Sequence, residues 1–259
     1  MSTVAANATL SVGVHEGIAR VTLDRPPLNI LDIDTIRELN RTLRDLREEP
    51  GLRAVVLAAR GRAFSAGVSV EDHLLEKADL MLHAFHETFR QLRALHCPLV
   101  AAVQGPAVGG GCEIAAFADV VIASEAATFG QPEIRLGVFP PVAAVRLAQR
   151  VGHVRALQLI LTGEVLSAPE AERIGLADRV VPAAELDAAV DQTTARFRDK
   201  SAAALRFAKR AFQAAAGRDF DAGLDAVERL FLEELMRTHD AAEGLRAFLE
   251  KRPPVWTHK

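Results

Sequence analysis

Short apolar runs alternate with segments of helical period through the first three-quarters of the chain. Residues 54–58, 99–103 and 119–123 are apolar runs typical of strands buried on both faces. Between the first two, apolar residues recur every three or four positions across residues 82–95, as they do on one face of a long helix. This alternation predicts a parallel α/β fold with right-handed crossover connections. Residues 10–14 and 18–23 predict two further strands before it.

The last quarter of the chain has a different pattern. No strand pattern remains beyond residue 197, and apolar residues between 224 and 235 share one helical face. A further helix is expected to begin with a cap at Asp240. We therefore predict a strand-and-helix core over residues 1–197 and a helical region over residues 198–259. So many apolar positions indicate packing on the chain's own core or on a neighbouring subunit.

Two glutamates are distinctive because each is the only acid in an apolar or glycine-rich run. Glu113 lies in GGGCEIAAF at 109–117, and Glu133 lies in FGQPEI at 129–134. A buried carboxylate is costly unless it is paired, hydrogen-bonded or protonated. Two such acids favour proton transfer, with one carboxylate acting as a base and the other as an acid. The alternative is that each caps a helix or pairs with a buried arginine.

A glycine run opens the helix that carries Glu113. Gly109, Gly110 and Gly111 follow the strand at 99–103 and its turn. Amide N–H groups at a helix start have no intrahelical partner, so they can hold an anion or a developing oxyanion. The spacing matches neither a dinucleotide-binding fingerprint nor a P-loop. The alternative is that these glycines only permit close packing.

A second loop, at residues 63–70, also joins a strand to a helix, and its amides could supply a further donor. Ser65 and Ser69 lack the Gly-x-Ser-x-Gly context of a nucleophilic serine. Because no acidic ligand pattern accompanies the histidines that follow, we expect them to be solvated, and we predict no metal site. These histidines are His73, His83, His86 and His96.

Bulk properties exclude several classes of function. A formal net charge of -3 gives no electrostatic basis for binding nucleic acid or an anionic membrane. Cys97 and Cys112 lie in apolar stretches, which predicts buried, reduced thiols. Residues 1–9 lack the pattern of a secretory signal, and the apolar runs are too short to cross a membrane. We therefore expect a cytoplasmic protein.

Three segments resemble the motifs of the crotonase (enoyl-CoA hydratase/isomerase) superfamily: FSAG at 64–67, GGGCE at 109–113 and FGQPE at 129–133. The similarity extends over nearly the whole chain. It implies an α/β fold with a spiral β/α core and a C-terminal helical trimerisation region, with trimers that often pair as hexamers. The separation of the two glutamates, 20 positions, fits the hydratase pattern in that family.

The resemblance also implies the roles of the site residues. An acyl-CoA thioester would bind with its carbonyl between the backbone amides of Val68 and Gly110, which form an oxyanion hole. Glu113 matches the glutamate that activates water, and Glu133 the one that delivers a proton to carbon. Other substrate-binding residues are expected at Ala66, Ser69, Val70, Gly109 and Phe139. Coenzyme A is part of such a substrate, so no separate cofactor is expected.

Two departures from the family pattern concern the acyl pocket. Ordinary enoyl-CoA hydratases have a glycine-rich segment where this chain has FPPVAAVR at 139–146, and Val68-Ser69 replaces the usual Ala-Asp. Pro140 and Pro141 would stiffen this wall, and residues 142–145 would line it. With SVEDH at 69–73, these segments resemble the cyclohexa-1,5-dienecarbonyl-CoA hydratases of anaerobic benzoyl-CoA degradation.

The resemblance therefore predicts addition of water to cyclohexa-1,5-diene-1-carbonyl-CoA, giving 6-hydroxycyclohex-1-ene-1-carbonyl-CoA through a dienolate. Two alternatives remain at this point. One is a hydratase or isomerase for linear or branched enoyl-CoA. The other is a non-catalytic acyl-CoA-binding protein that keeps the fold, although the presence of both glutamates is unfavourable to it.

Overall fold

The computed structural model describes residues 9–49 and 51–259. The prediction that residues 1–9 contain no secretory signal falls almost entirely on residues 1–8, which lie outside that description. Within the described residues a six-stranded sheet forms the centre, in the order β1-β2-β3-β4-β6-β9. All its neighbouring strands are parallel except the antiparallel pair β1 and β2. The strands are β1 (Leu10–His15), β2 (Ile18–Leu23), β3 (Ala54–Ala59), β4 (Leu99–Val103), β6 (Val120–Ser124) and β9 (Arg179–Val181).

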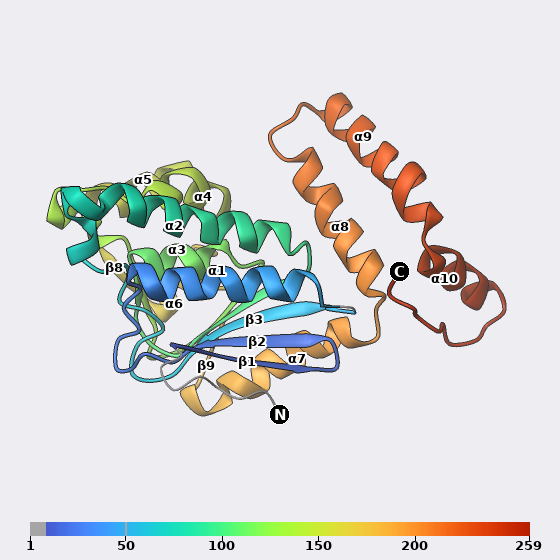
Figure 1. Cartoon of the computed structure of the whole chain (residues 1–259), viewed down its shortest axis with the longest axis horizontal. Helices are drawn as coiled ribbons and strands as arrows, with labels where there is room; N and C mark the ends of the chain where they lie inside the picture. Colours follow the sequence, from blue (N-terminus) through green and yellow to red (C-terminus); the bar gives the residue numbers. More distant parts are fainter. Residues whose placement is uncertain (1–8, 50) are drawn as a thin grey trace.

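Helices cover both faces of this sheet (Figure 1). On one face lie α1 (Ile33–Arg47), α2 (Leu75–Ala94) and α3 (Gly110–Phe117), which pack on the larger apolar core. On the other face lies α7 (Leu186–Arg198), which packs on Val56, Val100 and Ile122 through a smaller core. The alternation of strands and helices predicted from the sequence is thus confirmed, and both faces of β4 are buried as its continuous apolar run requires.

A second, three-stranded sheet of order β5-β7-β8 lies beside the first and was not predicted. Its strands are two or three residues long, too short to show a period of two. They are β5 (Ala107–Val108), β7 (Thr128–Gly130) and β8 (Val165–Ser167). This sheet brings the segments before Glu113 and before Glu133 together, because Val108 pairs with Gly130. Short helical elements follow: η2 (Pro132–Leu136), α4 (Pro141–Val151), α5 (His153–Thr162), α6 (Ala168–Arg173) and η3 (Ala183–Glu185).

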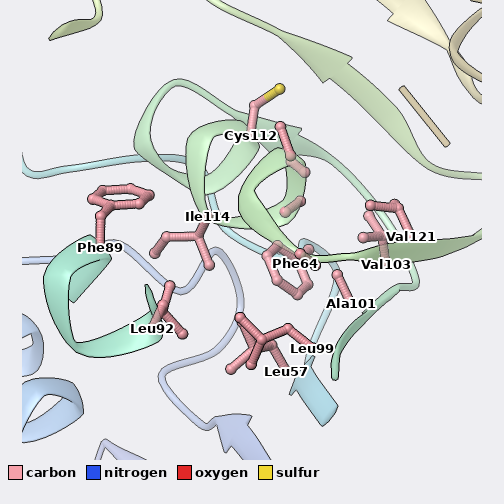
Figure 2. Close-up of a cluster of buried hydrophobic side chains, with 14 of the residues drawn as sticks. Leu57, Phe64, Phe89, Leu92, Leu99, Ala101, Val103, Cys112, Ile114 and Val121 are labelled. Carbon is pink, nitrogen blue, oxygen red and sulfur yellow. The ribbon is translucent and has the colours of Figure 1, made fainter. Parts of the chain in front are cut away.

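The helix that bears Glu113 rests on a packed apolar cluster. Figure 2 shows Ile114 of α3 beside Phe89 and Leu92 of α2, with Phe64 in the same cluster. Phe64 and Leu92 are completely inaccessible to solvent. Because packed interiors resist displacement, this cluster holds α3 in a fixed position.

The C-terminal helices extend away from the α/β part of the molecule (Figure 1). They are α8 (Ala202–Ala215), α9 (Phe220–Arg229) and α10 (His239–Leu249), with a π-helical turn (Leu230–Glu234) and η5 (Leu235–Arg237) between the last two. The predicted face of α9 is therefore interrupted at Leu230. Polar contacts tie α8 to the core, where the Lys209 ammonium donates to the Cys97 carbonyl at 2.7 Å and to the Asp119 carboxylate at 2.6 Å.

The expected cap of the last helix was wrong. Thr238, not Asp240, caps α10, and its hydroxyl accepts a hydrogen bond from the Ala241 amide at 3.2 Å. Asp240 is buried in the first turn, where it accepts hydrogen bonds from the Ser201 hydroxyl and the Thr257 amide. These donors hold the pKa of Asp240 at about 2, against the opposing effect of its burial.

Through the part of the chain described, no helix combines the length and apolar character needed to cross a membrane. Both cysteines are buried free thiols, as expected.

Candidate active site

Glu113 is buried at the junction of two helices. It lies in the first turn of α3, and its side chain reaches the start of α4, where Oε1 accepts a hydrogen bond from the Ala143 amide at 2.7 Å. Only 3% of Glu113 is exposed to solvent. Helix N-termini offer unpaired amides and a favourable dipole to a carboxylate, so α4 stabilises the ionised form of Glu113.

Burial nevertheless dominates the protonation of Glu113. Desolvation raises its pKa to about 8, the Ala143 amide opposes this, and the neighbouring charge of Glu133 raises the pKa further. Burial thus favours the protonated form of Glu113 in the free protein. The alternative proposed from the sequence was that each glutamate caps a helix or pairs with a buried arginine. For Glu113 the arginine pairing is wrong, but the helix contact is present, because its partner is a backbone amide in the first turn of α4.

Glu133 lies in η2, and burial raises its pKa above the ordinary value. Its Oε2 atom is buried and has no hydrogen-bond partner among the described residues. An acceptor left unpaired in this way is available to a water molecule or a substrate group. Glu113 and Glu133 face the same cavity, and two neighbouring carboxyl groups with raised pKa values tend to share a proton.

The glycine run makes this arrangement sterically possible. A side chain at Gly109, whose φ is 54°, would place its Cβ 2.8 Å from Oε1 of Glu133. At Gly110 a Cβ would lie 2.8 Å from Cγ2 of Val68, and at Gly111 it would lie 2.4 Å from the Ser65 carbonyl oxygen. These contacts are shorter than packed carbon atoms allow. The glycines therefore serve close packing and also leave room for Glu133.

Two backbone amides are left without acceptors beside the glutamates. On one side of the loop, the Leu31 amide donates to the Gly67 carbonyl at 3.0 Å, and the Ser69 amide donates to the Leu31 carbonyl at 3.0 Å. Strand-like backbone alternates its directions, so the amide of Val68 points the other way. Gly110 is the first residue of α3, so its amide has no intrahelical acceptor either. No described residue accepts from these two amides.

Both loops contribute to one cavity, of about 100 Å³, between α2, α3 and the segment around η2. The cavity brings together both glutamates, Val68, Gly110 and four of the five further residues expected to bind substrate. These four are Ala66, Val70, Gly109 and Phe139. The fifth, Ser69, lines the adjacent groove instead. The residues are placed as the oxyanion-hole hypothesis requires, although their roles stay predictions.

The expectation for residues 142–145 was wrong. Pro140 and Pro141 line the cavity, but residues 142–145 do not, and Val145 is 74% exposed. The reason is that α4 begins at Pro141, which turns the following side chains away and presents the amides of Val142 and Ala143 to Glu113. Proline suits the first position of a helix because its missing N–H would have no partner there.

The expectation that the histidines are solvated holds for His83 but not for the other three. His86, His96 and His73 are partly buried, and His73 lines the cavity. Sequence reasoning also missed the amide of Ala143. A helix start at two prolines was the available signal for that amide. His73 belongs to the SVEDH segment singled out at 69–73, although no role was predicted for its side chain.

Comparisons with known proteins place this geometry in a family. The profile of the enoyl-CoA hydratase/isomerase family matches residues 13–259. A probable enoyl-CoA hydratase of Mycobacterium tuberculosis is 39% identical over 97% of this chain and 98% of its own length. The cyclohexa-1,5-dienecarbonyl-CoA hydratase of Thauera aromatica is 42% identical over 93% of both chains.

Solved structures support the same assignment. The crystal structure of an enoyl-CoA hydratase of Mycobacterium smegmatis superposes with a TM-score of 0.90 and 30% identity, covering 96% of this chain and 99% of that one. The fold is the crotonase fold, with its spiral β/α core and C-terminal helices. The sequence, the fold and these relatives together show that the chain is an enzyme of the enoyl-CoA hydratase/isomerase family.

Proposed function

We propose that the protein adds water to an α,β-unsaturated acyl-CoA thioester. The single observation that carries this proposal is the pair of buried carboxyl groups, Glu113 and Glu133, in one cavity with two amides that lack acceptors. Hydration needs a base for water, an acid for the carbanion and donors for the enolate oxygen. The cavity offers all three.

The raised pKa values suit this reaction. Water between the two carboxyl groups would be held by both, and addition requires that the pair carry one proton in total. Glu113, with its pKa raised to about 8, keeps that proton at neutral pH before substrate binds. For Glu113 to accept a proton from water, this proton passes to Glu133, whose unpaired Oε2 then delivers it to carbon.

The amides of Val68 and Gly110 would bind the thioester carbonyl. A preorganised donor of this kind contributes about 3 to 4 kcal/mol to the stability of an oxyanion transition state. The groove of about 690 Å³ that begins at Ser69 lies next to the cavity and would take the longer coenzyme A portion. Coenzyme A enters as part of the substrate, so the proposed reaction needs no separate cofactor.

The test is hydration of crotonyl-CoA, followed by loss of absorbance of the conjugated thioester. Turnover that disappears when both glutamates are replaced by glutamine would support the proposal. Binding of the acyl-CoA without any turnover would instead support the non-catalytic alternative.

We further propose that the natural acyl group is the ring of cyclohexa-1,5-diene-1-carbonyl-CoA. Two features support this choice. The relative from Thauera carries that name, and the cavity is small and walled by Pro140 and Pro141, whose fixed φ makes the wall rigid. A preorganised wall favours a compact, rigid ring over a flexible chain.

The ring proposal predicts a kcat/KM at least about tenfold higher for the cyclic dienoyl-CoA than for crotonyl-CoA, which is about 1.4 kcal/mol of transition-state stabilisation. Both substrates are measured on the same preparation. An equal or reversed preference would leave the linear or branched enoyl-CoA hydratase as the function.

We also propose that the protein assembles as a homotrimer or a dimer of trimers. Large apolar side chains of the C-terminal helices are 76–82% exposed in the single chain: Phe212, Phe220, Phe248 and Leu249. A second exposed apolar row lies on α5 at Val154, Leu157 and Leu161, at helical spacing. Exposed apolar surface of this extent is typical of subunit interfaces.

The molar mass in solution at micromolar concentration tests the assembly, by light scattering or sedimentation. We expect three or six times the mass of one chain. Phe248→Glu should lower that mass, whereas Val14→Glu, at an exposed position of β1, should not. A monomeric mass for the unaltered protein would contradict the proposal.

A further inference from the structure

His73 places an imidazole in the wall of the catalytic cavity. It ends η1 (Glu71–His73), just beyond the loop that carries Val68. Apart from Glu113 and Glu133, it is the only titratable side chain among the described residues that line this cavity. The rest of the cavity is lined by apolar side chains, glycine, alanine and proline. His73 is therefore the one polar side chain, besides the two glutamates, that these lining residues offer to an acyl group.

The hydrogen bonding of His73 fixes what it can offer. Its Nδ1 atom lies 2.7 Å from the carbonyl oxygen of Ser69. A carbonyl oxygen can only accept, so Nδ1 carries the ring proton, and Nε2 of the neutral ring is then an acceptor. No group in residues 9–49 and 51–259 donates to Nε2. The acceptor is therefore available to a ligand.

An unpaired acceptor matters more once substrate fills the cavity. A hydrocarbon group against Nε2 would displace water without replacing its hydrogen bond, which costs free energy. An alcohol would replace that bond. It would also bring no net charge into a cavity whose other walls are apolar, apart from the two glutamates that the reaction uses.

We propose that Nε2 of His73 accepts a hydrogen bond from a hydroxyl on the acyl group, which makes His73 a specificity-determining residue for hydroxylated acyl thioesters. The inference rests on the proposed hydratase function and names a substrate class for it. The hydroxyl has two chemical sources. It is the one that hydration installs on the carbon β to the thioester, which agrees with the unsubstituted ring proposed above, or it is carried by the substrate on a distant carbon, which would replace that ring with a hydroxylated acyl group.

Inhibition constants measured against hydration of an enoyl-CoA test the proposal. Three saturated compounds are compared: cyclohexanecarbonyl-CoA, its 4-hydroxy derivative and its 2-hydroxy derivative. We expect one hydroxylated compound to inhibit about fivefold more tightly than the parent, the ordinary effect of one hydrogen bond. Tighter binding of the 4-hydroxy compound identifies a substrate-borne hydroxyl, and tighter binding of the 2-hydroxy compound identifies the hydroxyl made by hydration. A gain for neither overturns the proposal.

Substitutions at position 73 distinguish the contributions of the two ring nitrogens. His73→Asn keeps a donor toward the Ser69 carbonyl but has no group where Nε2 lies, so the ratio of the inhibition constants should fall to about one. His73→Gln places an amide oxygen near the position of Nε2 and should keep part of the preference. His83→Asn is the matched control, because Nδ1 of His83 also bonds a carbonyl four residues earlier, that of Asp79 at 2.8 Å, but on an exposed face.

A preference that survives in His73→Asn would overturn the inference. If hydration proceeds but the unaltered protein shows no hydroxyl preference, this inference fails and the proposed function stands. If no enoyl-CoA is hydrated and none of the three compounds binds, both fail.

Discussion

Glu113 and Glu133 face one cavity, but the regions that hold them differ in construction. Glu113 lies on a helix packed against the apolar core, and its carboxylate meets the amide of Ala143 at the start of a second helix. Glu133 lies on a short 3₁₀ segment, and Leu136 within it and Phe139 just after it are each 64% exposed. One Glu133 oxygen has no partner in the described chain.

The difference indicates a division of labour. The region around Glu113 is complete in the single chain, because the fold itself supplies the packing and the hydrogen bond. The region around Glu133 leaves one carboxylate oxygen without a partner, which in the proposed function would be supplied by water or the acyl group. Preorganised electrostatics on one side and an adaptable wall on the other would allow the same chemistry with different acyl groups.

The largest expected effect comes from removing either of the two carboxyl groups. Glu113→Gln and Glu133→Gln should each lower kcat by at least about 100-fold, because each removes a general acid–base group. Steady-state rates on the same enoyl-CoA measure this loss. Glu125→Gln, at an exposed glutamate between the two in sequence, is the control and should keep its activity. Near-normal turnover in either active-site variant would take that glutamate out of the mechanism.

A second prediction concerns the contact between the two regions. Gly109→Ala should lower kcat about tenfold, because its Cβ would lie 2.8 Å from Oε1 of Glu133 and displace the carboxylate. Gly152→Ala is the matched control, since Gly152 also combines a positive φ with an extended ψ (81° and 157°, against 54° and -131° at Gly109), but has open space around it. The two variants share the backbone strain, so equal losses would mean that strain, and not the position of Glu133, limits the rate.

The raised pKa of Glu113 predicts how activity depends on pH. Because burial raises this pKa to about 8, the carboxyl pair loses its shared proton as pH rises through that value. We expect kcat/KM to fall about tenfold for each pH unit above 8. The residual activity of Glu113→Gln should lack this alkaline fall. A rate that stays constant to pH 10 in the unaltered enzyme would contradict the assignment.

The smallest effect is on stability. A folded-state pKa near 8 against an ordinary value of 4.5 means that the folded protein binds the extra proton, so Glu113 lowers stability as pH rises from 4.5 to 8. Glu113→Gln should remove this dependence and raise the free energy of unfolding at pH 8, on the order of 2 kcal/mol. Thermal unfolding at pH 5 and pH 8 measures it. Glu133→Gln, at a less buried position, should change stability less.

The sequence predicted the features of this molecule that have a periodic or chemical signal. Apolar runs located β3, β4 and β6, and two isolated acids proved to line one cavity. The strands β5 and β7 gave no signal because they are only two and three residues long, yet their pairing joins the two glutamate segments. Their position depends on tertiary contacts that no local pattern contains.

Two errors have different physical origins. Asp240 has the pattern of a cap, but the tail residue Thr257 and Ser201 compete for its carboxylate in the folded chain. Residues 142–145 looked like a pocket wall, but the start of α4 at Pro141 rotates them away. Hydrogen bonds between segments far apart in sequence decided the first outcome, and the local start of a helix decided the second. The backbone donor that this start presents, Ala143 N, carries no residue signature.

The way in which α4 holds Glu113 has a consequence for how this protein could change over generations. The carboxylate is recognised by a peptide N–H, a group that every amino acid except proline provides, so position 143 can accept new side chains of similar size without losing the contact. The neighbouring residues Phe139 and Pro140 line the cavity proposed to hold the acyl group. In the proposed function, substrate choice and proton transfer would depend on different atoms of one short segment, so substitutions there could change the acyl group accepted without disturbing the proton transfer.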